Sequence, residues 1–174
     1  KSYLMHTQLE GLKHYFQSGA TQSYSFRLLQ LKRLKQVVLD YEKELYLALH
    51  ADLKKSEEES WATEIGFFIN ELNYTMDHLK EWMQPNSVPT NLLNQPSSCY
   101  TVREPLGVVC IIAPWNYPFQ LAISPLAGAI AAGNTSILKP SEIAPATSKI
   151  LAKSPFSSIT NKEYRPGLSW MEYL

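Results

Sequence analysis

The sequence has few of the residues that mark specialised classes of protein. Its 174 residues include two cysteines without a C-x-x-C spacing, which excludes a disulfide framework and a cysteine-rich zinc site. Sixteen basic and sixteen acidic residues cancel, so nucleic acid and anionic membranes are not expected as partners. No apolar run approaches the roughly 18–20 residues of a transmembrane segment. The first ten residues lack the apolar stretch of a signal peptide, and we therefore expect a cytoplasmic protein.

Common phosphate-binding and metal-binding motifs are also missing. The seven glycines never form G-x-G-x-x-G. Gly128 and Gly133 have the spacing of a Walker A loop, but Asn134 and Thr135 stand where Lys and Ser/Thr are required. The four histidines are scattered without an H-x-x-x-H pair, and we expect no metal site. With 45% hydrophobic residues, the composition indicates a globular protein of unspecified function.

Apolar residues recur at helical spacing through much of the first half. One stripe covers residues 31–48 and a second covers residues 61–83, each in steps of three and four. Ser56, with Glu59 three residues later, has the spacing of a capping box and marks the start of the second helix. A weaker helix is expected over residues 7–17. Each stripe needs a partner surface, because propensity alone stabilises an isolated helix too little.

The second half alternates between short apolar runs and an alanine-rich segment. The expected elements are strands at 99–104, 108–112 and 135–138 and helices at 119–132 and 145–153. The run at 108–112 is typical of a strand buried on both faces of a parallel sheet, and Gly133 suits the left-handed end of a helix. This order predicts an α/β fold, in which N-terminal helices precede the first part of an incomplete, doubly wound, Rossmann-like sheet.

Two polar segments follow the predicted parallel strands, at the end where such sheets bind ligands. Residues 114–118 (PWNYP) are either a rigid structural turn or a site in which Asn116 donates to a developing oxyanion. In the second segment, either Ser141 caps a helix and Lys139 and Glu142 are solvated charges, or Lys139 and Glu142 bind the ribose hydroxyls of a nucleotide. Residue chemistry alone leaves both pairs of interpretations open.

Neither cysteine is placed as a nucleophile. Cys110 lies inside an apolar run, where we expect a buried and inert thiol. Cys99 lies in the expected edge strand with no base nearby.

Several motifs follow one another in a fixed order through the second half. They are REPLGVV (103–109), APWNYPF (113–119), PL with AIAAGN (125–134) and LKPSE (138–142). In this order they resemble the NAD(P)-dependent aldehyde dehydrogenase superfamily. The helical half resembles its class 3-type branch at residues 26–27, 51–56, 63–66 and 82–83, and the match covers residues 7–153.

The resemblance implies oxidation of an aldehyde to a carboxylate with NAD or NADP. A cysteine thiolate attacks the carbonyl, an amide holds the oxyanion, nicotinamide accepts a hydride and a glutamate activates water. By resemblance, Asn116 is the oxyanion amide, and Lys139 and Glu142 bind the adenosine ribose. The strand end beside the cofactor comprises Ile112, Ala113, Pro114 and Trp115.

The family's nucleophilic cysteine, general-base glutamate and second glycine motif match nothing in this sequence. From Arg165 onward the resemblance stops, and we expect a member truncated or frame-shifted after about residue 164, inactive alone and weak in cofactor binding. The alternatives are a non-catalytic interaction module and a nonfunctional remnant. Unpaired strand edges favour a homo-oligomer or an association-prone chain. The predicted divisions are the N-terminal helical part of the cofactor domain (1–84), an irregular connection and strand (85–104), the first βαβα segment (105–153) and an atypical tail (154–174).

Overall fold

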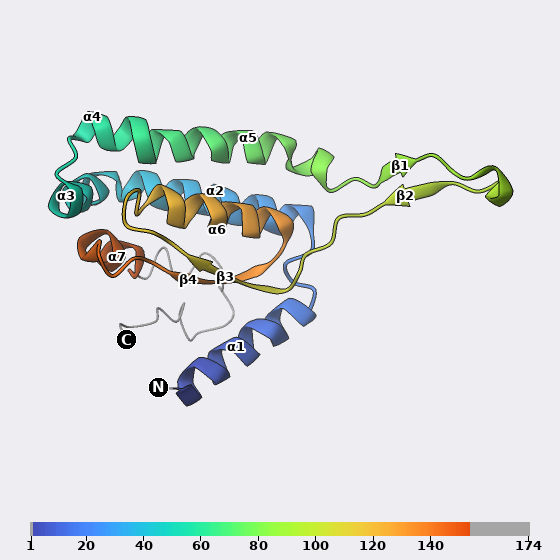
Figure 1. The fold of residues 1–174 in the computed structure, drawn as a ribbon, viewed down its shortest axis with the longest axis horizontal. Helices are drawn as coiled ribbons and strands as arrows, with labels where there is room; N and C mark the ends of the chain where they lie inside the picture. Colours follow the sequence, from blue (N-terminus) through green and yellow to red (C-terminus); the bar gives the residue numbers. More distant parts are fainter. Residues whose placement is uncertain (1, 154–174) are drawn as a thin grey trace.

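The computed structural model describes residues 2–153, with side chains from residue 6. The helices are α1 (Ser2–Gln17), α2 (Tyr24–Asp40), α3 (Glu42–Leu53), α4 (Glu57–Ser60), α5 (Gly66–Trp82), α6 (Gln120–Ala132) and α7 (Pro145–Leu151). The strands are β1 (Asn86–Val88), β2 (Cys99–Thr101), β3 (Val108–Ile112) and β4 (Thr135–Lys139). Helix α6 lies between the parallel pair of strands β3 and β4 and the long helices α2 and α5 (Figure 1). The predicted tail at 154–174 lies outside the described residues.

The stripe predicted over residues 31–48 is buried, but it belongs to two helices rather than one. Its buried members are Leu31, Leu34 and Val38 on α2 and Leu45 and Ala48 on α3. Between them, Tyr41 leaves the helical region, with φ −104° and ψ 11°. The break keeps the apolar spacing in phase, so the periodicity of the sequence gives no sign of it. Helix α1 ends at Gln17 as predicted and starts earlier, at Ser2.

The second stripe begins at the predicted cap and contains an irregular turn. The Ser56 hydroxyl accepts a hydrogen bond from the Glu59 N–H at 3.1 Å. Between α4 and α5, Trp61–Ile65 form a π-helical turn, which inserts one extra residue and rotates the residues before it. Ile65, Phe68, Leu72 and Leu79 are buried as expected. Trp61 is 42% exposed, so its assignment to the buried stripe was wrong, because the π turn shifts the helical phase.

The predicted strand–helix–strand unit is present. Strands β3 and β4 pair in parallel from Val108 with Thr135 to Ile112 with Lys139, and α6 crosses between them. Helix α6 packs on one face of this sheet and contacts α2 and α5 on its other side, while α1 contacts both strands from the opposite face (Figure 1). Pro145 opens α7, where its fixed φ suits a first helical turn.

Strand β3 is not buried on both faces, which corrects the sequence-based expectation. Ile111 is buried on the α6 side, whereas Ile112 is 71% exposed. Cys110 is also exposed, so the buried thiol predicted there is wrong. Alternate residues of a strand face opposite sides: α6 covers one face, whereas α1, on the other face, leaves Cys110 and Ile112 exposed. The apolar run predicts a strand, but it does not show which elements cover each of the strand's two faces.

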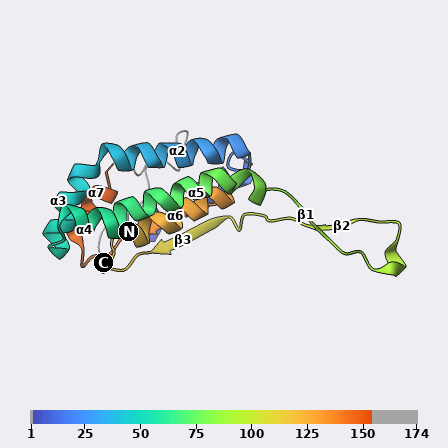
Figure 2. The ribbon, with the colours of Figure 1, turned by 90° about the horizontal axis from the view of Figure 1, so that it is seen from above.

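An antiparallel hairpin extends away from the rest of the molecule (Figures 1 and 2). It consists of β1 and β2, paired from Asn86 with Thr101 to Val88 with Cys99. The strand predicted at 99–104 is thus confirmed in shorter form, whereas β1 lies in a segment that the sequence predicted to be irregular. At the base of the hairpin, Arg103 Nη1 donates to the Trp82 carbonyl at 3.0 Å.

Gly133 ends α6 in the left-handed conformation, as predicted, with φ +86°. The buried Arg27 guanidinium packs against it and donates from Nη1 to the Ala131 carbonyl and from Nε to the Thr21 carbonyl, each at 3.1 Å. Burial lowers the pKa of Arg27. A cation at the C-terminal end of a helix interacts favourably with its dipole, so Arg27 ties α2 to the end of α6.

We expect Gly133→Ala to destabilise the chain by at least about 1–2 kcal/mol, the cost of a left-handed residue that carries a Cβ. That Cβ would also lie 2.5 Å from Arg27 Nη2. The matched control is Gly128→Ala within α6, where an added Cβ meets nothing within 4 Å. Because alanine is the better helix former, the control should gain up to about 1 kcal/mol. Urea unfolding measures both; equal stability of the Gly133 variant and the parent would contradict the account.

No helix in the described part of the chain is both long and apolar enough to cross a membrane.

Candidate functional site

The carboxyl ends of the two parallel strands lie side by side and bring the sequence-predicted residues together. Ile112 pairs with Lys139, and the Ala113 N–H donates to the Lys139 carbonyl at 2.9 Å. This end of the sheet carries Ile112, Ala113, Pro114, Trp115, Asn116, Lys139 and Glu142. Crevices outside such strand ends are where open parallel sheets bind ligands.

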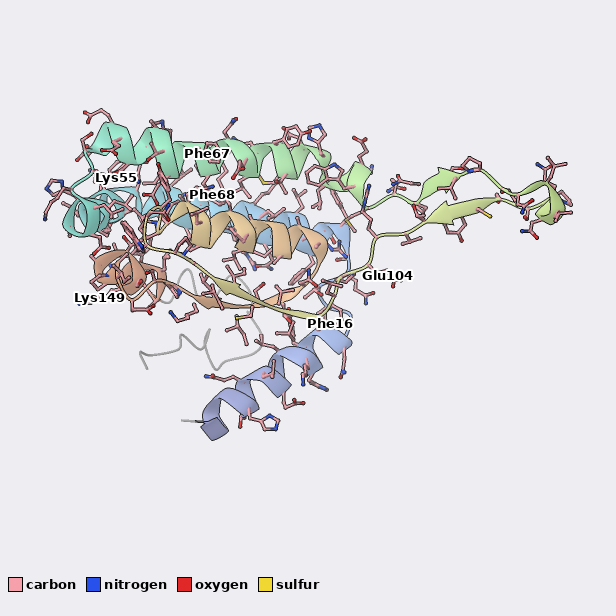
Figure 3. The ribbon with its side chains drawn as sticks, viewed as in Figure 1. Phe16, Lys55, Phe67, Phe68, Glu104 and Lys149 are labelled. Carbon is pink, nitrogen blue, oxygen red and sulfur yellow. The ribbon has the colours of Figure 1, made fainter. Side chains whose placement is uncertain are left out.

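Asn116 lies in a loop over residues 113–119, of which residues 114–117 are exposed and Ala113, Pro118 and Phe119 are buried. Its side-chain amide has no hydrogen-bond partner among the described residues, so both of its N–H donors are available. The end of this loop is anchored, because the fully buried Phe119 ring packs edge to face on Phe68, with centroids 5.8 Å apart. Figure 3 shows Phe68 on the side of α5 that faces α6. The loop is therefore exposed in the middle and fixed where α6 begins.

A carboxylate from the first half of the chain caps α6. Oε2 of the fully buried Glu64 accepts hydrogen bonds from the N–H groups of Phe119 (2.9 Å) and Gln120 (3.2 Å). Oε1 of the same carboxylate lies 2.6 Å from Lys55 Nζ, in an ion pair that is almost completely buried. The negative charge sits at the positive end of the helix dipole, which is the favourable orientation.

Lys55 connects this pair to the middle of the loop. Its ammonium lies 4.2 Å from the centroid of the Tyr117 ring, a cation–π contact. Its backbone carbonyl contacts His50 Nδ1 at 3.1 Å, and Nζ also donates to Thr63 Oγ1 at 3.4 Å. Lys55 thus contacts both the cap of α6 and the residue next to Asn116.

Lys139 and Glu142 form an ion pair beside the end of β4, with 2.5 Å between Nζ and Oε2. The hydrogen bond from Lys139 lowers the pKa of the Glu142 carboxyl, and the backbone N–H of Glu142 acts in the same direction. Glu142 is therefore a carboxylate at neutral pH. Both side chains reach solvent, at 32% and 59% exposure, and are accessible to a ligand.

Ser141 does not cap α7, so that part of the structural interpretation is wrong. Its hydroxyl accepts from the Ile143 N–H at 3.3 Å, within the turn before the helix. The cap of α7 is Asp52 of α3, which accepts from the N–H groups of Ala146 (3.0 Å) and Thr147 (2.8 Å) and from the Thr147 hydroxyl (2.8 Å). Both helices that follow the strand ends are thus capped by carboxylates from the first half.

The sequence analysis gave no role to Asp52, Lys55 or Glu64. The sequence did indicate, however, that α6 and α7 need capping groups from elsewhere in the chain. The residues that precede α6 and α7 are Phe119 and Ala144, and neither provides a side-chain cap. A helix end without a local cap needs another partner for its free N–H groups. That reasoning predicts distant acceptors without identifying them.

A cavity of about 430 Å³ lies at the other end of α6 and is separate from this site. Its lining includes Arg27, Leu79, Trp82, Arg103, Glu104 and Ala132. Figure 3 places Glu104 near the base of the hairpin, far along α6 from Lys55.

Comparisons with known proteins agree on one family. The sequence model of the aldehyde dehydrogenase family matches residues 10–155. An aldehyde dehydrogenase of Craterostigma plantagineum is 50% identical over 83% of this chain and 30% of its own length. Aldehyde dehydrogenase family 3 member H1 of Arabidopsis thaliana is 45% identical over 82% of this chain and 29% of its own. The substrate-bound structure of AldH from Staphylococcus aureus has a TM-score of 0.84 at 38% identity, covering 92% of this chain and 34% of that one. The chain thus spans about 30% of the length of the curated relatives that it matches.

Proposed function

Because the chain belongs to the aldehyde dehydrogenase family, with class 3 relatives, we propose that it forms part of an NAD(P)-dependent enzyme that oxidises an aldehyde to a carboxylate. The observation that supports this proposal is the juxtaposition, at one end of the parallel strands, of an exposed amide and an exposed ion pair. Asn116 lies in the loop after β3, Lys139 is the last residue of the hydrogen-bonded neighbour β4, and Glu142 lies in the turn after β4.

The proposed role of Asn116 is to donate a hydrogen bond to the oxyanion. Attack of a nucleophile on an aldehyde converts the carbonyl oxygen into an oxyanion, and an oriented N–H donor stabilises that charge as it develops. The Asn116 side chain is exposed and has no partner among the described residues, so its donors can be directed at a ligand.

The residues at this site also fit the adenosine end of NAD or NADP. An ionised carboxylate accepts hydrogen bonds from ribose hydroxyls, and the lowered pKa of Glu142 keeps it ionised. The surface beside the pair would be formed by Ile112, Ala113, Pro114 and Trp115. Since Glu64 and Asp52 already occupy the N-termini of α6 and α7, neither end is free to bind a phosphate. When bound, NAD(P)+ accepts the two electrons and the hydrogen that the aldehyde carbon loses.

We expect calorimetric titration of the 174-residue chain with NAD+ and NADP+ to give weak binding that depends on Lys139. Lys139→Ala should weaken binding by about tenfold, the effect of losing one charge-assisted hydrogen bond of about 1.5 kcal/mol. The matched control is Lys149→Ala, an exposed lysine on α7 (Figure 3) that should have no effect. A low-micromolar dissociation constant, or equal effects of the two variants, would contradict this assignment.

A hybrid enzyme tests the proposed reaction. Residues 10–155 would replace the matched segment of the Craterostigma plantagineum aldehyde dehydrogenase. We expect aldehyde-dependent reduction of NAD+ or NADP+, because the two strand ends would supply the oxyanion donor and the ribose contacts. A hybrid that folds and binds the nucleotide but oxidises no aldehyde would refute the proposal.

We also propose a cytoplasmic location and association between copies of the chain. Two exposed cysteines without a disulfide fit a reducing compartment. Large apolar side chains are exposed on and beside the hairpin, among them Leu92, Leu93 and Leu106, and such surfaces commonly form interfaces.

A further inference from the structure

The loop that carries Asn116 is restrained at both ends by hydrogen bonds to residues outside it. At its start, the Ala113 N–H donates to the carbonyl of Lys139. At its end, the N–H groups of Phe119 and Gln120 donate to Glu64. An oxyanion donor is effective only where its position is fixed before the reaction. The residues that hold this loop therefore determine whether the Asn116 amide is fixed in position as a hydrogen-bond donor.

Glu64 can hold the end of the loop because of the π-helical turn in which it lies. The turn Trp61–Ile65 carries the Glu64 carboxylate into the interior, where its exposure is zero. There it accepts two N–H groups on one oxygen and the Lys55 ammonium on the other. Single π-helical turns occur frequently at functional sites.

Lys55 extends the restraint from the end of the loop to its middle. Its ammonium bridges Glu64 (2.6 Å) and the Tyr117 ring (4.2 Å), and Tyr117 directly follows Asn116. Capping α6 does not require this lysine, because a carboxylate alone satisfies the free N–H groups. Buried ion pairs are often no more stabilising than apolar residues of similar volume. Through the contact between Lys55 and Tyr117, the ion pair also restrains the position of the ring next to Asn116.

We propose that Lys55 and Glu64 are positioning residues that fix the orientation of Asn116, an inference that rests on the proposed role of that amide. Glu64 fixes the point where the loop enters α6. Lys55 fixes the neighbouring aromatic ring. Neither residue needs to touch the substrate or the cofactor.

Asp52 provides a matched control. It is also a carboxylate from the first half that caps a helix after a strand end, with three hydrogen bonds. Its partners are Ala146 and Thr147 of α7, and no described contact joins it to residues 113–119. A change at Asp52 removes a comparable cap while leaving the Asn116 loop alone.

The test is NMR of the full 174-residue chain, which follows the Asn116 side-chain NH2 signals and hydrogen exchange at single amides. We expect Glu64→Gln to speed exchange at Phe119 and Gln120 at least about tenfold, as loss of a hydrogen bond to a charged acceptor predicts. The Asn116 NH2 signals should shift or broaden in the same variant. Asp52→Asn should instead speed exchange at Thr147 and leave Asn116 unchanged.

Variants of Tyr117 extend the test to a position that tolerates change, since this side chain is 40% exposed. Tyr117→Leu removes the ring and should shift the Asn116 signals without changing exchange at Phe119. Tyr117→Phe keeps the ring and should restore the parent signals, which a general structural defect would not do. These variants decide the question even where Glu64→Gln does not fold.

Unchanged Asn116 signals in Tyr117→Leu, or equal changes in Asp52→Asn and Glu64→Gln, would overturn the inference. The parent chain offers one more check, because its Phe119 and Gln120 amides must exchange more slowly than those of Trp115 and Asn116. Failure of the hybrid enzyme with these NMR results intact would refute the proposed function and leave the restraint of the loop standing. An active hybrid with unchanged signals would refute the positioning role alone.

Discussion

Replacing Glu64 with leucine is expected to lower the free energy of unfolding by about 3–5 kcal/mol, the range seen when one member of a buried ion pair is removed. The variant leaves the Lys55 ammonium buried without its counter-ion. It also leaves the N–H groups of Phe119 and Gln120 without their acceptor. Because small domains have only about 5–15 kcal/mol of stability in total, this is the most disruptive single change expected here. Urea denaturation followed by circular dichroism measures it.

The double variant Lys55→Met, Glu64→Leu serves as the control. Removing both charges should recover part of the loss, since the buried cation is then gone. It should not recover all of it, because the two N–H groups of α6 remain without an acceptor. The coupling would be refuted if Glu64→Leu lowered the free energy of unfolding by less than about 1 kcal/mol. It would also be refuted if the effects of Lys55→Met and Glu64→Leu on that free energy simply added in the double variant.

Replacing Asn116 with alanine in the hybrid enzyme is expected to lower kcat by about 100- to 1000-fold, the usual effect of losing one oxyanion donor. Asn116→Asp should be at least as damaging, because it keeps the shape but loses both N–H donors and adds a negative charge. Stability should change little, since the amide has no partner among the described residues. Initial rates at saturating NAD(P)+ and aldehyde measure the effect.

An exposed asparagine on the hairpin provides the comparison. Asn86→Ala in the same hybrid should leave kcat unchanged, because β1 lies far from the strand ends (Figure 1). An Asn116→Ala hybrid with the kcat of the parent would remove this residue from the reaction.

The parts of the fold that the sequence predicted well are those with a local signal. The apolar run of β3, the alanine-rich α6 and the glycine at 133 each determine their own structure, and together they specified the parallel unit. The break at Tyr41 and the π-helical turn at Trp61–Ile65 were missed because both interrupt helices without interrupting the apolar pattern. Strand β1 was missed because all three of its residues are exposed and carry no alternation.

The candidate site divides in the same way. Lys139 ends β4, and Asn116 and Glu142 lie in the segments just beyond the two strands, so the placement of all three could be reasoned from the chain order; their roles are proposals. Lys55 and Glu64 could not be found in this way, since Glu64 meets Phe119 across 55 positions of sequence. Which distant side chain reaches an uncapped helix depends on how the helices pack, and no local pattern records that.

The two carboxylates that cap α6 and α7 also affect how the molecule unfolds. Glu64 and Asp52 belong to the first half, and the N–H groups that they satisfy belong to the second. Neither half can open by itself without leaving charged or polar groups unsatisfied in the half that stays folded. The helices of the first half and the parallel unit therefore form one cooperative unit, and their most slowly exchanging amides should exchange through the same global opening. The hairpin shares none of these contacts and can open independently.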